Sequence, residues 1–237
     1  MMDGTRRSFD LEAIRADFPI LSREVHGKPL VYLDSAASAQ KPAQVLDALM
    51  SAYQDTYANV HRGLHFLSEA STDLYEAVRG KVAGFIGAAS GDEIVLTSGA
   101  TMSLNLIARC WAQPRLQPGD EILISIAEHH ANIVPWQMVA EATGARVRAF
   151  TLEDDGAFSM ARLKAEMSER TRIISVPHVS NVLGTVFPVA EIAELAHDAG
   201  ALMVVDGCQG VVHMPVDVTA LGADFYCLLY TSDAADE

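Results

Sequence analysis

The 237-residue sequence has no long hydrophobic run, and no apolar stretch approaches the roughly 20 residues that a membrane-spanning helix needs. The first residues contain no continuous apolar segment followed by small side chains, so no signal peptide is predicted. Cysteine is scarce, and Cys110, Cys208 and Cys227 are too widely spaced for a disulfide framework or a zinc ribbon. We therefore expect no membrane partner and a cytoplasmic location, with each cysteine serving as a small buried hydrophobe.

Basic residues are also scarce. Lys and Arg number 17 against 31 Asp and Glu, which gives a formal net charge of −14. Binding to a phosphate backbone needs clustered basic side chains, so the composition argues against a nucleic-acid partner. Half of the residues are hydrophobic and 20% are charged, a balance typical of a globular protein large enough for an ample core.

From Glu93 onward, short β-branched runs alternate with longer amphipathic stretches. The expected strands are 93–97, 121–125, 145–150, 172–176, 202–206 and 224–229, and the expected helices lie near 101–112, 134–143, 159–168 and 188–199. Before residue 90 we expect helices at about 10–17, 42–57 and 68–86 and a short strand at 31–34. Several strands are apolar at consecutive positions, as strands buried on both faces are. The pattern predicts an α/β fold with a mainly parallel central sheet and helices on both faces.

A run of four apolar residues, 202–205, precedes Asp206, and a glycine turn follows it. A carboxylate at the exit of a buried strand needs a cationic partner, and a protonated ring nitrogen of a cofactor is one such partner. Gln209 follows on the same edge of the predicted sheet, and Asn181 follows the preceding strand. As isolated residues they read equally well as turn formers, a helix cap or metal ligands.

Two further segments fall at the same edge. Residues 97–101, Thr-Ser-Gly-Ala-Thr, stand between an expected strand and an expected helix, where free backbone N–H groups favour an anion, although an ordinary capped helix start is the commoner use of such a segment. His129 and His130 follow the 121–125 strand, and an imidazole there can stack on a flat ring or be an ordinary surface histidine.

Together these loops supply an anion cradle, a stacking ring, an amide and a carboxylate at one edge of the sheet. A planar, phosphorylated and protonatable ring needs this set, and pyridoxal 5′-phosphate has those properties. A competing interpretation is a zinc hydrolase that uses His61, His65, His129 and His130, but Gly63 lies within the His61/His65 pair and no Glu-x-x motif accompanies it. The sequence predicts no metal site.

Five longer motifs in the sequence resemble those of a known protein family. They are DFPILSREVHGKPLVYLDSAASAQKP (17–42), NVHRGLH (59–65), EHHANIVPWQ (128–137), HVSNVLGT (178–185) and VVDGCQ (204–209). From about residue 9 to residue 228 the chain resembles the class V aminotransferase family of pyridoxal-phosphate enzymes with fold type I, and within it the cysteine desulfurases of the SUF type. The resemblance implies an N-terminal arm at 1–30 and a cofactor-binding large domain at 31–228, incomplete at its C-terminus.

The resemblance also implies roles residue by residue. Thr101 and the backbone at Ala100 would hold the cofactor phosphate, and His129 would stack on the pyridine ring. Asp206 would pair with the ring nitrogen, while Asn181 and Gln209 would bond the phenolic oxygen and its surroundings. His61 would lie near the mouth through which substrate enters.

The implied reaction takes sulfur from L-cysteine, leaves L-alanine and passes a persulfide to an acceptor protein of the SUF system for iron–sulfur cluster assembly. The implied assembly is a homodimer. Alternatives within and outside the fold are selenocysteine lyase or another class V enzyme, and a binding module that keeps the phosphate cradle without the chemistry.

The sequence departs from the family pattern after Leu228. The family continues with Ser-Gly-His-Lys, whose lysine forms a Schiff base with the cofactor, whereas Leu229, Thr231 and Ser232 stand at the aligned serine, histidine and lysine positions. The chain has four lysines, Lys28, Lys41, Lys81 and Lys164, and none follows the last expected strand. The family's catalytic cysteine and carboxylate-binding arginine are also missing. We therefore expect a truncated and inactive chain with a non-native tail at 229–237.

Overall fold

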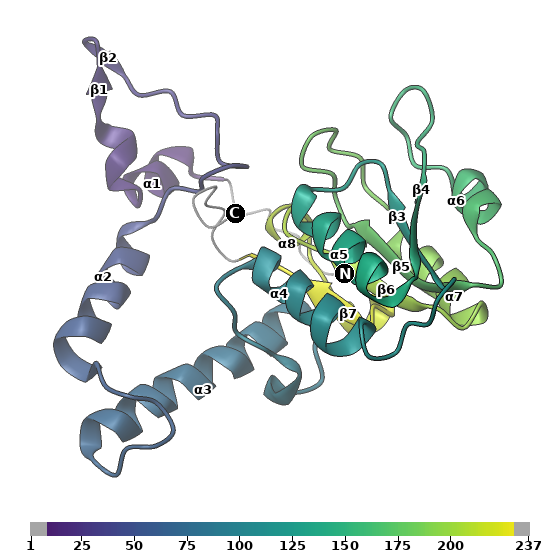
Figure 1. Cartoon of the computed structure of the whole chain (residues 1–237). Helices are drawn as coiled ribbons and strands as arrows, with labels where there is room; N and C mark the ends of the chain where they lie inside the picture. Colours follow the sequence, from purple (N-terminus) through teal and green to yellow (C-terminus); the bar gives the residue numbers. More distant parts are fainter. Residues whose placement is uncertain (1–8, 230–237) are drawn as a thin grey trace, which may run out of the picture. The chain divides into compact units, whose positions relative to one another are not determined.

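The computed structural model describes residues 9–229 and divides the chain into two compact units, with the boundary between Glu76 and Ala77 (Figure 1). The domain boundary expected at residue 30 stays a prediction. Residues 230–237, which include most of the expected non-native tail, lie outside the described part of the chain.

The first unit contains short elements and most of one long helix. They are α1 (Leu11–Ala16), η1 (Pro19–Ser22), β1 (Glu24–Val25), β2 (Lys28–Pro29), α2 (Ala43–Ser51), η2 (Ala52–Thr56) and α3 (Phe66–Ile86), which continues beyond the unit. Asp10 caps α1 by accepting a hydrogen bond from the Ala13 N–H at 3.0 Å. His26 and Gly27, with φ of 55° and 72°, form the two-residue turn that joins β1 to β2. The three helices expected in this region are confirmed.

The strand expected at 31–34 is wrong, because these residues form no ladder with another segment. Val31 and Leu33 are 77% and 91% exposed, so the apolar pattern there does not mark a buried strand. The segment instead forms a loop in which the Tyr32 hydroxyl donates to the Ser38 carbonyl oxygen at 2.6 Å.

The second unit is a three-layer α/β structure. Its elements after α3 are η3 (Gly91–Glu93), α4 (Ala100–Leu106), η4 (Ile107–Ala112), β3 (Glu121–Ser125), η5 (His130–Asn132), α5 (Val134–Thr143), β4 (Arg146–Phe150), α6 (Met160–Glu166), β5 (Thr171–Pro177), α7 (Val189–Asp198), β6 (Leu202–Asp206), α8 (Gly210–His213), α9 (Val218–Leu221) and β7 (Phe225–Cys227). The five strands pair in the order β4-β3-β5-β6-β7, and every pair is parallel. This confirms the predicted fold class.

The order of the strands creates a switch point between β3 and β5. The chain passes from β3 outward to β4, then returns to β5 and continues in the opposite direction to β6 and β7. The loops that leave β3 and β5 therefore diverge to opposite sides of the sheet. In open parallel sheets, ligands bind at the carboxyl ends of the strands beside such a point.

Two hydrophobic clusters cover the two faces of the sheet. On one face Ile122, Ile124 and Val204 pack with Leu104 of α4 and Trp136 of α5. On the other, a second set packs with helices α6 and α7; its strand members are Leu123, Ile174, Val176, Met203 and Val205, and its helical members include Leu163 and Ile192. Neighbouring residues of one strand thus point into different clusters, which explains why the strands are apolar at consecutive positions.

Residues 93–97 do not form the expected strand. Glu93 ends the 3₁₀ helix η3, which Ser90 caps, and the following residues lie outside any ladder. Val95 is 73% exposed, so the β-branched pattern of this segment has no sheet against which to pack. The remaining expected strands and helices of the second unit are confirmed with shifted ends, and η4 continues α4 as π-helical turns. No helix within residues 9–229 combines the length and the apolar character needed to cross a membrane.

Candidate functional site

Asp206 ends β6 in a buried position. Its side chain is 7% exposed, and its Oδ1 accepts a hydrogen bond from the Cys208 N–H at 3.1 Å. Its carbonyl oxygen accepts from the His178 N–H at 2.8 Å, which ties the end of β6 to the residue that follows β5. Within residues 9–229 no Lys, Arg or His forms an ion pair with this carboxylate. The site therefore holds a buried acid whose cationic partner is not supplied by the described chain.

The glycine turn after Asp206 is shaped by two packed rings, the buried His178 and the half-buried Tyr226. The Tyr226 hydroxyl lies 2.9 Å from Nδ1 of His178, and the two rings meet edge to face. A Cβ on Gly207 would overlap the Tyr226 ring, and one on Gly210 would lie 2.6 Å from Nδ1 of His178. Burial raises the pKa of Tyr226 and lowers the pKa of His178, so this pair is neutral at physiological pH. Glycine is required at both positions because the pair packs directly against the backbone.

A second carboxyl group lies near this edge, on Glu128 in the loop after β3. Oε1 accepts from the Ser125 hydroxyl at 2.5 Å, and Oε2 accepts from the Asn132 amide at 2.7 Å. Burial raises the pKa of Glu128 to about 8, with a contribution from the negative charge of Asp206, against the opposing effect of these hydrogen bonds. Glu128 and Asn132 are not among the site residues expected from the sequence. Their i, i+4 spacing beside a buried strand is the signal that could have found them.

The rings of His129 and His130 meet edge to face. Their ring centroids are 6.0 Å apart and the ring planes are at 78° to each other. His129 is half-buried, and its Nδ1 accepts a hydrogen bond from the Ala131 N–H at 3.2 Å. His130 is exposed.

Ala100 and Thr101 are the first two residues of α4, where backbone N–H groups have no partner within the helix. Gly99 precedes them with φ of 157°, a conformation that favours glycine. Thr97 fixes this turn, because its hydroxyl lies 2.8 Å from that of Ser103 and accepts from the Gly99 N–H at 3.3 Å. α4 packs against both η5 and β7, so its start belongs to the same region of the unit as the loop after β3.

Asn181 and Gln209 follow β5 and β6, as predicted. Asn181 is exposed and lies in a turn closed by a hydrogen bond from the Gly184 N–H to the Ser180 carbonyl oxygen at 3.0 Å. Gln209 is half-buried, and its Oε1 lies 3.2 Å from Nε2 of His213. The structure thus brings the residues after β3, β5 and β6 to the carboxyl ends of neighbouring strands. It shows Asn181 with its side chain in solvent.

His61 belongs to the first unit, so its distance from Asp206 is not defined. Its Nε2 lies 2.7 Å from Oε1 of Glu76, its ring meets Tyr75 edge to face, and its φ is 68°. Its expected position at a substrate mouth stays a prediction. The zinc alternative requires several ligands around one point, and no group of three or more His, Cys, Asp or Glu side chains within residues 9–229 could hold a metal ion.

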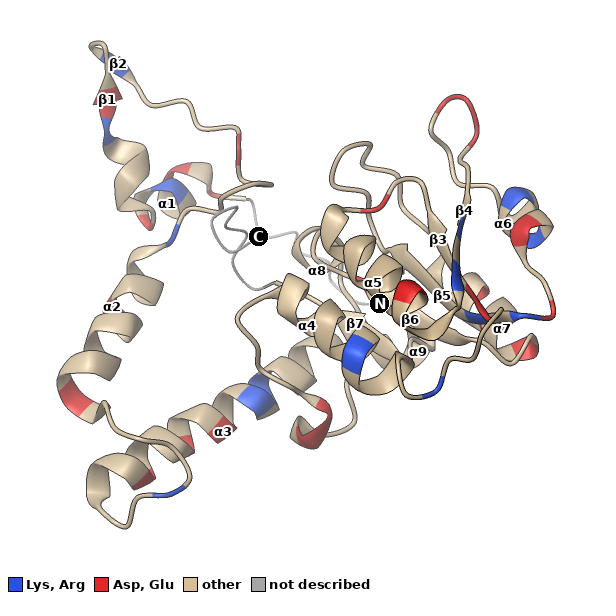
Figure 2. Cartoon of the chain, viewed as in Figure 1, with Lys and Arg blue, Asp and Glu red and all other residues tan. Residues whose placement is uncertain are grey.

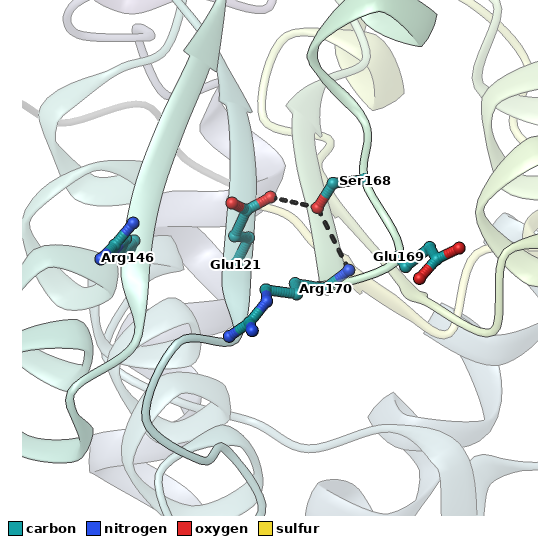
Figure 3. A pocket seen from close by; sticks show the side chains of 5 residues that line it. All are labelled: Glu121, Arg146, Ser168, Glu169 and Arg170. Carbon is teal, nitrogen blue, oxygen red and sulfur yellow. Dashed lines mark hydrogen bonds between the residues drawn. The ribbon is translucent and has the colours of Figure 1, made fainter.

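A hollow of about 600 Å³ lies at the opposite edge of the sheet, where β3, β4 and β5 begin (Figure 3). It is lined by Glu121, Arg146, Ser168, Glu169 and Arg170. Ser168 donates to Glu121 at 2.6 Å, and this bond, more than the nearby arginines, lowers the pKa of Glu121. In Figure 2, ribbon segments coloured for basic and for acidic residues lie near this end of the sheet. Because a parallel sheet binds its ligand at the carboxyl edge, this mixed-charge hollow is not the candidate site.

A parallel α/β sheet with a buried carboxylate at the end of β6, beside the switch point, defines a ligand-binding α/β protein whose site lies at the carboxyl edge. The profile of the family described as Aminotransferase class-V matches residues 31–228, and the chain belongs to this family. Its fold is that of pyridoxal-phosphate enzymes of fold type I. The predicted family membership is confirmed.

Relatives named cysteine desulfurase match most of the chain. The protein from Enterobacter sp. (strain 638) is 52% identical over 219 residues, which are 92% of this chain and 54% of the relative. The protein from Dickeya dadantii (strain 3937) is 53% identical over 218 residues, 92% of this chain and 53% of that relative. The chain therefore spans about half the length of the curated relatives it matches.

Two solved structures of cysteine desulfurases are also similar to this chain. The cysteine desulfurase CsdA from Escherichia coli, in an S-sulfonic acid form, superposes with a TM-score of 0.81 and 44% identity over 92% of this chain and 53% of that one. The apo cysteine desulfurase from Thermococcus onnurineus NA1 gives a TM-score of 0.85 and 35% identity over 95% of this chain and 54% of that one.

Proposed function

We propose that the carboxyl edge of the sheet binds pyridoxal 5′-phosphate. The observation that carries the proposal is Asp206, a buried carboxylate without a cationic partner within residues 9–229, placed beside the switch point of the sheet. The pyridine nitrogen of the cofactor, once protonated, is a cation of the right size for it. The residues present therefore fit the group.

The other predicted residues complete the proposed site. The N–H groups at Ala100 and Thr101, with the Thr101 hydroxyl, would hold the phosphate at the start of α4. His129 would stack on the ring, and Asn181 and Gln209 would bond the phenolic oxygen and its surroundings. The negative charge of Asp206 would raise the pKa of the ring nitrogen and keep it protonated. When bound, the cofactor supplies a ring that accepts the electrons of a bond broken in an amino-acid substrate.

We further propose that the whole protein is a cysteine desulfurase of the SUF type. It would convert L-cysteine to L-alanine and pass the sulfur as a persulfide to an acceptor protein for iron–sulfur cluster assembly. We also propose a homodimer in the cytoplasm, with His61 near the substrate entrance. The support is the identity of 52–53% to relatives of that name over 92% of this chain.

The chain of 237 residues is proposed to lack this activity by itself. Of its four lysines, Lys28 lies in β2, Lys81 in α3 and Lys164 in α6, and the Lys41 amine donates to the Ala39 carbonyl oxygen at 2.7 Å. None of them follows β7, where the family places its cofactor-binding lysine. The second candidate function is a binding module that holds the phosphorylated ring without transforming substrate.

A chimera tests the proposal. Residues 1–228 are joined to the part of the Enterobacter relative that this chain does not match, and sulfide release from L-cysteine is measured for the chimera, for the unmodified chain and for a chimera with Asp206→Asn. The expected result is activity in the first chimera, none in the unmodified chain and a large loss in the Asp206 variant. A folded chimera that binds the cofactor without releasing sulfide or selenide would support the binding module, and release of selenide alone from selenocysteine would support selenocysteine lyase.

A further inference from the structure

A buried hydrogen-bond network holds the loop that carries His129 in place. Its centre is Asn132, which is fully buried: its amide donates to Glu128, while its Oδ1 accepts from the Trp136 indole N–H at 2.8 Å and from the Ser175 hydroxyl at 2.7 Å. Ser125 closes the network on the β3 side with two hydrogen bonds to Oε1 of Glu128. The network therefore joins β3, η5, α5 and β5 around the switch point.

Glu128 is the member of this network that touches the site. It precedes His129 directly, and the hydrogen bonds from Ser125 and Asn132 engage both of its oxygens. The bond from the Ala131 N–H to His129 Nδ1 lies between these two anchor points. The segment 128–132 is therefore fixed at each end and in the middle. Loss of the Glu128 carboxyl would free the segment and leave the Asn132 amide without its partner in a buried position.

The charge state of Glu128 agrees with this structural role. Burial raises its pKa to about 8, so the protonated carboxyl predominates near neutral pH. The charged group that acts on it is Asp206, at the end of β6, whereas its direct contacts, Ser125 and Asn132, are neutral. A protonated carboxyl can donate to Ser125 while it accepts from Asn132. Ionisation would place a second negative charge near Asp206.

We infer that Glu128 is a positioning residue of the candidate site: through Ser125 and Asn132 it fixes the segment that presents His129, and so it sets the affinity of the carboxyl edge for a phosphorylated pyridine ring. The inference rests on the proposed cofactor site. It assigns to Glu128 no contact with the ring and no proton transfer to substrate.

The test is the affinity of the 237-residue chain for pyridoxal 5′-phosphate, measured by quenching of tryptophan emission in a Trp111→Phe background, so that Trp136 is the reporter. The variants are Glu128→Gln and Glu128→Ala. Glu128→Gln keeps the shape; its remaining oxygen can accept from the Asn132 amide while its own amide donates to the Ser125 hydroxyl. Glu128→Ala removes both contacts. Glu141→Ala is the matched control, because Glu141 is an exposed residue of α5. Each protein is titrated at pH 6.5 and at pH 9.5, with circular dichroism as the check of folding.

The expected result at pH 6.5 is that Glu128→Ala weakens binding about tenfold, while Glu128→Gln and Glu141→Ala bind as the parent does. At pH 9.5 the affinity of the parent should differ from that of Glu128→Gln, because only the parent then carries the extra charge. The ligand-free emission of Trp136 should change in Glu128→Ala and stay constant in Glu141→Ala. A structural residue without influence on the site would not produce the pH difference between the parent and the isosteric variant.

Equal affinities of all variants at both pH values would overturn the inference and leave the proposed function intact. If the parent chain does not bind the cofactor, both the proposed function and the inference fail. If Glu128→Ala does not fold, the comparison of the parent with Glu128→Gln at the two pH values decides.

Discussion

We expect the buried charge of Asp206 to destabilise the ligand-free protein and to favour binding of the ligand. The carboxylate is 7% exposed and accepts one hydrogen bond, from Cys208, and within residues 9–229 no cation pairs with it. In Asp206→Asn, the carbonyl oxygen of the new side chain keeps the acceptor for Cys208 and the charge is removed. Burial of an unpaired charge is costly, so we expect this variant to be more stable by about 1–2 kcal/mol, which corresponds to a rise in Tm of roughly 2–8 °C for a chain of this size.

The assay is thermal and urea unfolding of the parent, of Asp206→Asn and of Asp154→Asn, with and without pyridoxal 5′-phosphate. Asp154 is the matched control, because its side chain is fully exposed and lies 3.9 Å from its nearest arginine partner. The control should change stability by less than about 0.5 kcal/mol. Added cofactor should stabilise the parent and have little effect on Asp206→Asn, because a charge-assisted hydrogen bond contributes about 1.5–3 kcal/mol.

The same variant should also lower the pKa of Glu128, since the charge of Asp206 is one of the causes that raise it. A variant that unfolds more easily than the parent, and that the cofactor stabilises equally well, would refute the reasoning. It would show that Asp206 is a structural acid whose charge the protein already compensates.

Three further predictions concern the network, the glycine turn and the core. Because the pKa of Glu128 is raised in the folded protein, its contribution to the free energy of unfolding is fully present below pH 4.5 and is lost as the pH rises to about 8. Glu128→Gln should remove this pH dependence, which amounts to at most roughly 5 kcal/mol, in urea unfolding measured across the range. Gly207→Ala should cost about 1–3 kcal/mol through overlap with the Tyr226 ring, and the cost should fall in a Tyr226→Ala background; equal costs in the two backgrounds would contradict the geometry. Leu163→Ala should cost about 2–5 kcal/mol, because Leu163 is fully buried in the α6–α7 cluster, whereas the exposed Leu183→Ala should cost less than about 0.5 kcal/mol; similar losses for both would disprove the assignment of the core.

The buried strands of the second unit were predictable because their residues repeat a local pattern. Apolar runs such as 202–205 can be buried on both faces only between two layers of helices, and the helical segments between the strands favour a parallel sheet. The segment 93–97 has the same kind of pattern, but whether a strand forms depends on a neighbour with which it can pair, and no local signal shows that neighbour. The strand expected at 31–34 failed for the same reason.

Part of the candidate site could likewise be predicted from the sequence, and part of it could not. Asp206, His129 and Gln209 follow buried strands, and a parallel sheet brings the ends of its strands to one edge, so their grouping followed from the order of elements. The network around Asn132 depends on Ser175, which is 43 residues away along the chain, and on burial that only packing creates. The His178–Tyr226 pair likewise joins residues 48 apart, so the requirement for glycine at 207 and 210 could not be read from the turn itself.

The central claim is that Asp206 is the partner of a pyridinium nitrogen, and the most direct measurement is the ¹⁵N chemical shift of the ring nitrogen of labelled pyridoxal 5′-phosphate bound to the chain. We predict a protonated ring nitrogen in the parent up to a pH well above the point at which the free cofactor loses that proton, and loss of this protection in Asp206→Asn. A bound cofactor whose ring nitrogen titrates in the parent as it does in solution would contradict the account.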